Sequence, residues 1–355
     1  MRKIDLASAL LALAVLVPTQ ASAQNGNERI FYYVDREDAY RSLVQNISQI
    51  SVIAPSSYGV DEEGIVWGDV DPIVLDLAKR HNVRVMPLLV NRPFDKNQLH
   101  QLLSSPAARA RTIASMVELS KRHSYWGMQI DFENVHIDDR DALTGFYRDA
   151  AKAMHAAGKI ISIAVVHRPE EVAGVSQYHA WMMADWRGGY DLKALADAGD
   201  FVSVMTYSQH TRRTPPGPSA ALPWARDVVK YFLRFMPPQK LSLGIPVGGM
   251  LWYTSQEDRI TPELARSYSQ NVSYSWAKHI AERNRVQLTW HDDYKVSYAF
   301  FPIAGTFEYL FVEDARSFAA KLELMKSEKL RGFSVWVLGP EDPAIWNTLR
   351  SFTAN

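Results

Sequence analysis

The sequence predicts an α/β protein, a (β/α)8 TIM barrel with a small α+β insertion between its seventh and eighth strands. Short apolar runs rich in β-branched residues alternate with amphipathic helical runs from Arg29 onward. This alternation is typical of parallel strands covered by helices. No glycine-rich phosphate loop follows any of the apolar runs, which favours a closed barrel over an open doubly wound sheet.

Eight candidate strands follow one another along the chain. They span residues 30–34, 50–55, 83–90, 127–133, 159–166, 200–207, 240–247 and 332–339. The clearest helical patterns between them cover residues 105–123, 139–158 and 313–329. The interval before the last strand is too long for one helix, so we interpret residues 253–305 as the insertion. The prediction is therefore one barrel domain over residues 24–355.

The first 23 residues have a different character. Arg2 and Lys3 give a basic start, an apolar run extends from Leu6 to Val17, and Ala21-Ser22-Ala23 is a small-residue cleavage site. This pattern is typical of a secretory signal peptide and is too short for a membrane anchor. We therefore expect a secreted or periplasmic protein whose mature chain begins at or near Gln24.

Composition narrows the possible partners. The chain has no cysteine and a formal net charge of zero, and no Lys/Arg block follows residue 3. Nucleic acid and anionic membranes are therefore not expected as partners, and disulfides are impossible. Ten Trp and sixteen Tyr residues fit either a large core or platforms for sugar stacking.

The stretch "YWGMQIDFENV", residues 125–135, places polar side chains at every second position. Gln129, Asp131 and Glu133 alternate with apolar residues, so in a strand they share one face. Chemistry in such barrels sits at the carboxyl ends of the strands. Tyr207 ends the sixth predicted strand and Trp336 lies near the end of the eighth. These side chains are thus expected at the barrel mouth.

Two carboxyls on one strand limit the chemistry. Asp131 and Glu133 approach a bound sugar from the same side, whereas ordinary glycosidases place carboxyls on opposite sides. This spacing suits a reaction in which the 2-acetamido oxygen of the substrate attacks the anomeric carbon. Glu133 would act as general acid, and Asp131 would hold the acetamido N–H and raise the pKa of Glu133.

The same residues carry a family resemblance. "WGMQIDFEN" resembles the DxxDxDxE signature of glycoside hydrolase family 18, the chitinase family, and most resembles its bacterial branch of spore-cortex and peptidoglycan N-acetylglucosaminidases. Further similar segments are "VRVMPLLVN", "YDLKALADAGDFVSVMTYSQH", "PPQKLSLGIPVGG" and "LRGFSVWVLGPEDPAIW". The resemblance covers nearly the whole mature chain in order.

The resemblance implies roles for four residues. Glu133 matches the catalytic acid and Asp131 the aspartate that orients the acetamido group. Tyr207 matches the tyrosine that supports the acetamido oxygen, and Trp336 matches the tryptophan under the −1 sugar.

Four positions depart from the family pattern. Trp126 and Gln129 replace the first two aspartates of the signature, Ser208 replaces the aspartate of "MTYD", and Gly248 replaces an aromatic residue. We expect Gln129 to hydrogen-bond Asp131, and we include Gln129 and Ser208 among the substrate-binding residues. These changes affect rate and substrate choice more than the reaction class.

Three further features have open interpretations. Trp252 is either a wall of a sugar subsite or part of the core of the insertion. His136, Asp138 and Asp139 superficially suggest a metal site, but we interpret them as a helix cap and expect no metal or cofactor. The cationic loop 212–220 either contacts an anionic glycan or caps the barrel.

The sequence therefore predicts a monomeric glycosidase that cleaves polymers containing N-acetylglucosamine, either peptidoglycan or chitin-type. The alternative is a non-catalytic or weakly active chitinase-like protein that binds such glycans. Glu133 favours the enzyme, because sugar-binding members of the family typically lose the acid at this position.

Overall fold

The computed structural model describes residues 27–211, 214–253, 268–303 and 305–354. The predicted signal peptide lies outside these residues, and so do Arg212, Arg213 and part of the predicted insertion.

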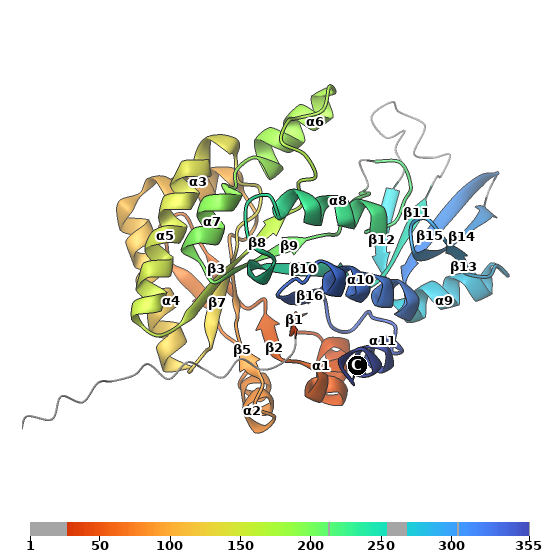
Figure 1. Cartoon of the computed structure of the whole chain (residues 1–355), viewed down its shortest axis with the longest axis horizontal. Coiled ribbons are helices and arrows are strands. Elements are labelled where there is room, and N and C mark those ends of the chain that lie inside the picture. Colours follow the sequence, from red (N-terminus) through yellow and green to blue (C-terminus); the bar gives the residue numbers. More distant parts are fainter. Residues whose placement is uncertain (1–26, 212–213, 254–267, 304, 355) are drawn as a thin grey trace, which may run out of the picture.

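Within the described residues, parallel strands close into the predicted barrel (Figure 1). β1 lies between β2 and β16, and the order continues from β16 through β10, β9, β8 and β7 to β6. The ring closes because β5 pairs with β2 while β6, two residues further along the chain, pairs with β7. The barrel strands are β1 (Glu28–Tyr33), β2 (Val52–Pro55), β5 (Arg84–Val85), β6 (Leu88–Val90), β7 (Gly127–Asp131), β8 (Ile160–Val166), β9 (Phe201–Met205), β10 (Leu241–Pro246) and β16 (Gly332–Trp336).

The third predicted strand, 83–90, is split into β5 and β6 by Pro87. Proline has no N–H and cannot continue a ladder on both sides. Met86 N donates to Ile53 O at 3.0 Å on one side, and Pro87 O accepts from Gln129 N at 3.0 Å on the other. The stretch therefore exchanges one neighbour for the other at this proline. The short strands β3 (Tyr58–Val60) and β4 (Val66–Gly68) form a hairpin beside β6.

Helices cover the outside of the barrel (Figure 1). The apolar residues that face them form one large core, and a second core of residues such as Ile30, Val52 and Leu88 fills the barrel interior. The helices are α1 (Glu37–Asn46), α2 (Pro72–Arg80), α3 (Lys96–Ser104), α4 (Pro106–Arg122), α5 (Arg140–Ala156), α6 (Gln177–Met182), α7 (Leu192–Ala198), α8 (Leu222–Phe232), α10 (Ala315–Ser327) and α11 (Ile345–Ala354). Single turns are η1 (Ile47–Gln49), η2 (Ile137–Asp139), the π-helical η3 (Met183–Arg187) and η4 (Pro238–Lys240).

An antiparallel sheet with one helix lies between β10 and β16, the position predicted for the α+β insertion. Its strands begin at Gly248 and end at Glu313, so the sheet extends beyond the predicted limits of 253–305. The helix packs on one face through residues such as Leu251, Ala277 and Leu310. In sheet order the strands are β12 (Tyr268–Val272), β11 (Gly248–Tyr253), β15 (Thr306–Glu313), β14 (Val296–Ile303) and β13 (Thr289–His291), and the helix is α9 (Tyr274–Arg283).

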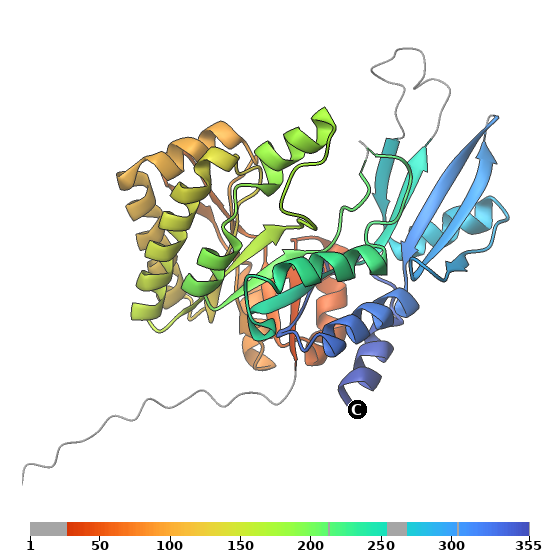
Figure 2. The same ribbon diagram turned by 45° about the horizontal axis from the view of Figure 1, so that its top comes forward.

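Two structures rise from the same side of the barrel (Figure 2). One is the small sheet, and the other is the segment 167–191, which follows β8 and contains α6 and η3. Both flank the barrel face on which the candidate site lies. No helix among the described residues combines the length and the apolar character needed to span a membrane.

Candidate active site

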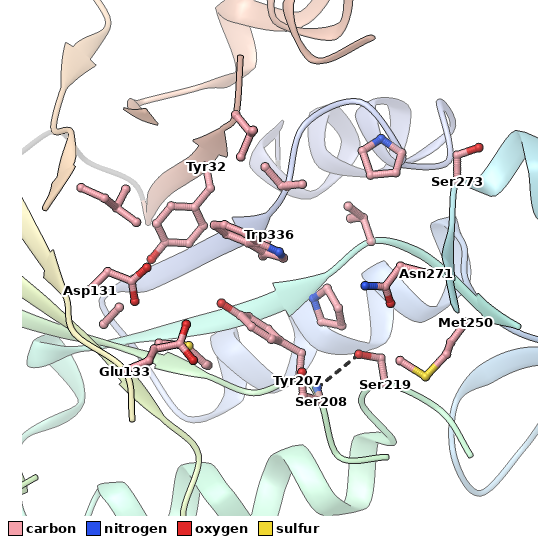
Figure 3. Close-up of a pocket in the computed structure, with 18 of the residues that line it drawn as sticks. Tyr32, Asp131, Glu133, Tyr207, Ser208, Ser219, Met250, Asn271, Ser273 and Trp336 are labelled. Carbon is pink, nitrogen blue, oxygen red and sulfur yellow. Dashed lines mark hydrogen bonds between the residues drawn. The ribbon is translucent and has the colours of Figure 1, made fainter. Parts of the chain in front are cut away.

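A cavity of about 500 Å³ opens at the carboxyl ends of the barrel strands. This volume is in the range of small-ligand sites. On the barrel side it is lined by Tyr32, Asp131, Glu133, Tyr207 and Trp336, and on the side of the small sheet by Met250, Asn271 and Ser273 (Figure 3). The predicted alternation along residues 127–133 thus brings both carboxyl groups to the barrel mouth.

The backbone N–H and C=O of Glu133 are hydrogen-bonded by the side chain of Asn91 and not by a neighbouring strand. β7 ends at Asp131, two residues before the predicted end. Asn91, which follows β6, accepts from Glu133 N at 2.9 Å and donates to Glu133 O at 2.9 Å. Tyr190 OH donates to Phe132 O at 2.6 Å. These three bonds fix the position of the Glu133 main chain where the ladder has stopped.

Burial makes both carboxyl groups resist ionisation. Asp131 is 6% exposed, and burial, followed by the charge of Glu133, raises its pKa well above the ordinary value, against a smaller opposing effect of Arg92. Burial also raises the pKa of Glu133, against a smaller opposing effect of Trp186. The two groups titrate as a pair, so a proton stays on the pair to a higher pH than on exposed carboxyls.

The predicted aromatic residues lie around the carboxyl pair. Tyr207 lines the cavity, and burial raises its pKa well above the ordinary value, so its hydroxyl remains a donor. The Trp336 ring lies 5.5 Å from the ring of Tyr32, with the planes tilted by 58°. Ser208 also lines the cavity, and its N–H donates to Ser219 Oγ at 3.3 Å. The structure therefore groups Asp131, Glu133, Tyr207, Trp336 and Ser208 around one cavity.

Gln129 lies below the cavity instead of in it. Its side chain is fully buried: Oε1 accepts from Tyr32 OH at 2.6 Å, and Nε2 donates to Ser162 Oγ at 2.9 Å and to Ser203 Oγ at 3.1 Å. The amide group of Gln129 is therefore hydrogen-bonded to these three inward-facing hydroxyls and not, as expected, to Asp131. Gln129 therefore supports Tyr32 and is buried too deeply to contact a substrate.

Trp252, the other predicted substrate contact that is not at the cavity, is buried on the face of β11 opposite to Leu251 and the core formed with α9. It is fully buried, and its indole N–H donates to Gly217 O at 3.1 Å. The bond joins β11 to the loop after β9. Trp252 is therefore a packing residue between the small sheet and this loop, and neither a wall of the cavity nor part of the core that Leu251 forms with α9.

Several cavity residues were not predicted. Tyr32, His167 and Trp186 line the cavity together with Asn271 from β12. Tyr32 had a usable signal, because it shares the inward parity of Ile30 in a predicted strand. His167 and Trp186 lie in the segment after β8, where no periodic pattern indicates which side chains return to the site.

The residues that suggested a metal site make other contacts. His136 Nδ1 accepts from Asp138 N at 3.2 Å at the start of η2, and Asp139 bonds His100 Nδ1 at 2.6 Å. Asp139 occupies the N-cap position of α5, but its carboxylate is used by His100 and not by the helix backbone.

Comparisons with known proteins give a family and several relatives. The family model described as Glycosyl hydrolases family 18 matches residues 29–341. An uncharacterized glycosylase, YvbX of Bacillus subtilis, is 23% identical over 98% of this chain and 97% of its own. The cortical fragment-lytic enzyme of Bacillus subtilis is 28% identical, over 76% of this chain and 60% of its own.

Solved structures show the same fold. A chitinase from Chromobacterium violaceum superposes with a TM-score of 0.80 at 23% identity, covering 93% of this chain and all of the other (100%). The spore cortex-lytic enzyme SleL of Bacillus cereus also gives a TM-score of 0.80, at 20% identity, covering 92% of this chain and 74% of its own.

Proposed function

The chain belongs to family 18 of the glycosyl hydrolases, and we propose that it cleaves β-linked N-acetylglucosamine glycans, of peptidoglycan or chitin type, by substrate-assisted catalysis. Glu133 is the general acid, and the acetamido group of the −1 sugar is the nucleophile. Bond cleavage proceeds with retention of the anomeric configuration.

The observation that carries this mechanism is the position of the acidic groups. Among the described residues that line the cavity, the carboxyl groups are those of Asp38, Asp131 and Glu133. Asp131 and Glu133 belong to one strand and its extension, so they share one wall. Asp38 is bound by Arg36 at 3.1 Å and accepts from Ala39 N at 3.0 Å. A protein nucleophile facing Glu133 is thus missing from these residues, and the substrate supplies it.

Each step uses a group that the cavity presents. Glu133 gives its proton to the leaving glycosidic oxygen as the acetamido oxygen bonds to the anomeric carbon. Asp131 accepts a hydrogen bond from the acetamido N–H. Its negative charge balances the positive charge on the ring that closes when the acetamido oxygen bonds to the anomeric carbon. Tyr207 OH donates to the acetamido oxygen, and the Trp336 ring packs against the apolar face of the sugar. Water then attacks the anomeric carbon from the vacated side, and Glu133 takes its proton.

The names of the relatives support the substrate class. A cortical fragment-lytic enzyme and chitinases occur among the similar proteins. Incubation with peptidoglycan and with chitin oligomers, described below, distinguishes the two polymers.

We also propose export from the cytoplasm after removal of residues 1–23, on the basis of the basic start, apolar run and Ala-Ser-Ala site. Mass spectrometry of the natively exported protein is expected to show a first residue at or near Gln24. An intact Met1 on the exported protein would contradict this.

The test of the proposed function is direct. Purified protein is incubated with peptidoglycan and with chitin oligomers, and the products are identified by mass spectrometry. Wild type is expected to release fragments that end in N-acetylglucosamine, and Glu133→Gln is expected to lose at least ~10²-fold of the rate while still binding glycan. Binding by the wild type without any release would instead support the glycan-binding alternative.

A further inference from the structure

The small sheet carries exposed aromatic rings outside the cavity. Phe300 on β14 is 54% exposed and Phe307 on β15 is 48% exposed. Their ring centroids lie 6.0 Å apart in an edge-to-face arrangement, and the ring of Tyr309 lies 6.4 Å from that of Phe300. Exposed apolar side chains that contact one another mark interaction sites more often than single ones do. The mechanism described above uses none of these rings.

Strand register places these rings on the face of the sheet that also lines the cavity. Asn271 on β12 is paired with Met250 on β11, and both line the cavity. Met250 is also paired with Phe311 on β15. Tyr309 lies two residues before Phe311, so it shares the same face, and it is paired with Phe300. Paired residues point to one side of a sheet, and the aromatic side chains therefore continue the cavity wall outward from the barrel.

The other face of the sheet is closed by α9. Leu251, Phe301 and Leu310 belong to the core that this helix forms with the sheet, and they alternate with the residues of the aromatic face. Glu308 has the parity of Leu310, so its charge belongs to the side of α9. One face is thus filled by a helix, whereas the other carries the exposed rings.

The loop after β9 covers only the part of the aromatic face that is nearest the barrel. Gly217 O accepts from the Trp252 indole N–H at 3.1 Å, and Pro218 lines a small cavity together with Phe311. Phe307 lies four residues before Phe311, which is about 14 Å along the strand. The outer rings therefore rise beyond this loop, where β14 and β15 extend away from the barrel (Figure 2).

We propose that Phe300, Phe307 and Tyr309 form an aromatic platform, a second glycan-binding site that holds the part of a polysaccharide chain lying outside the catalytic cavity. The identity of the polymer, a glycan containing N-acetylglucosamine, rests on the proposed function. A ligand that reaches both the cavity and the outer rings must be a chain and not a single sugar.

The chemistry of the aromatic platform fits a neutral carbohydrate. Pyranose rings present C–H groups on their faces and hydroxyls at their edges. The rings of Phe300 and Phe307 can pack against the former, and Tyr309 adds a hydroxyl that both donates and accepts. Among the described side chains that share this face of β14 and β15 from Phe311 to the turn, none is charged. The face therefore offers no electrostatic attraction to nucleic acid or to an anionic membrane.

Two variants separate the aromatic platform from general surface stickiness. Phe300→Ala with Phe307→Ala removes both exposed rings and changes no residue that lines the cavity. Trp276→Ala is the matched control, because Trp276 is 49% exposed and lies on α9, on the other side of the sheet. For binding measurements both are made in the Glu133→Gln protein, so that bound glycan is not cut.

The first experiment compares a polymer with a short ligand. Binding to insoluble chitin and to purified peptidoglycan is measured by co-sedimentation, and binding of a disaccharide of N-acetylglucosamine by calorimetry. Phe300→Ala with Phe307→Ala is expected to weaken binding to the polymer about 10-fold and to leave disaccharide binding unchanged, which also shows that the cavity is folded. Trp276→Ala is expected to bind both ligands as Glu133→Gln alone does.

Three results overturn the proposal. They are polymer binding by the double variant that is no weaker than that of Trp276→Ala, an equal loss of disaccharide binding, and absence of polymer binding by Glu133→Gln itself.

A second measurement asks whether another copy of the chain occupies the face. Sedimentation velocity without glycan is expected to give the same molecular mass for the protein with and without Phe300 and Phe307. A dimer that dissociates when both rings are replaced by alanine would show that the face is a subunit interface, and this result also overturns the proposal.

The consequence for catalysis depends on substrate length. With Glu133 present, Phe300→Ala with Phe307→Ala is expected to lower kcat/KM on the insoluble polymer about 10-fold, mainly through KM, and to leave hydrolysis of short soluble oligomers unchanged. An equal loss on both substrates contradicts a site outside the cavity. Absence of hydrolysis of every glycan by wild type would overturn the proposed function, whereas co-sedimentation of the Glu133→Gln proteins would still decide the role of the aromatic platform.

Discussion

Asp131 and Glu133 are held in a place where their charges are unfavourable. Asp131 Oδ1 has no hydrogen-bond partner among the described residues, and burial raises the pKa of both groups. A carboxyl that keeps its proton to higher pH is suited to general acid catalysis. The same burial lowers the free energy of unfolding once the groups ionise. The arrangement that suits catalysis therefore makes the fold less stable.

Replacing Asp131 by Asn is therefore expected to stabilise the fold at neutral pH. The pKa of Asp131 is higher in the folded than in the unfolded state, so its contribution is fully present below the unfolded value, about 3.9, and is lost as pH rises through the folded value. Thermal unfolding at pH 7 should show a Tm about 3 °C above wild type, with activity reduced.

The pH dependence separates this effect from better packing. The Tm difference should shrink as pH falls and vanish well below the unfolded pKa of about 3.9, where Asp131 is neutral in both states. Asp292→Asn, at an 86% exposed side chain, serves as control and should change Tm little at either pH. A lower Tm for Asp131→Asn at pH 7 would contradict the electrostatic account.

Gln129 has a structural role that can be tested separately. Gln129→Leu leaves the hydroxyls of Tyr32, Ser162 and Ser203 without their present partner in a buried place. We expect a loss of about 3 kcal/mol in the free energy of unfolding, measured by urea titration. Gln101→Leu, on the exposed side of α3, is the control. A loss no larger than that of the control would show that the network contributes little.

Residue alternation predicted which polar side chains meet, but not their partners. Asp131, Glu133, Tyr207 and Trp336 were expected at the mouth because strand parity and strand ends can be read from the sequence. That Gln129 bonds Tyr32 instead of Asp131 depends on which inward side chains of β1, β7, β8 and β9 lie at the same level. The sequence pattern of one strand does not contain that information.

At the scale of elements, local backbone chemistry explains where strands differ from the prediction. Pro87 divides one expected strand, and the side chain of Asn91 replaces the ladder at Glu133. Gly248, where the family has an aromatic residue, has φ of +83°, and a Cβ there would lie 2.7 Å from Val272 O. The start of β11 therefore requires glycine at this position.

The small sheet is joined to the barrel helices by a buried ion pair. Lys321 Nζ on α10 lies 2.6 Å from Glu313 Oε2 on β15, and both side chains are buried. Lys321→Met would leave the Glu313 charge without compensation, and we expect a loss of about 3 kcal/mol in the free energy of unfolding.

The double variant Lys321→Met with Glu313→Gln removes the isolated charge and should recover most of that stability in urea titrations. A double variant as unstable as Lys321→Met alone would show that packing, and not charge, dominates at this junction.

At the scale of the whole molecule, the regular alternation of strand and helix patterns predicted the barrel. It did not predict which segments form the walls of the site. The segment 167–191 and the small sheet both rise beside the barrel mouth and supply Trp186 and Asn271 to the cavity (Figure 2). Their positions depend on contacts such as Arg187 with His167, between residues that no periodicity connects.

The central claim is that the substrate supplies the nucleophile while Glu133 supplies the proton. It is tested most directly by early-time NMR of the anomer released from fully acetylated oligomers, compared with oligomers deacetylated at the −1 sugar. The expected result is a retained anomer from the acetylated substrate and no cleavage of the deacetylated one. An inverted product, or efficient cleavage of the deacetylated oligomer, would contradict the mechanism.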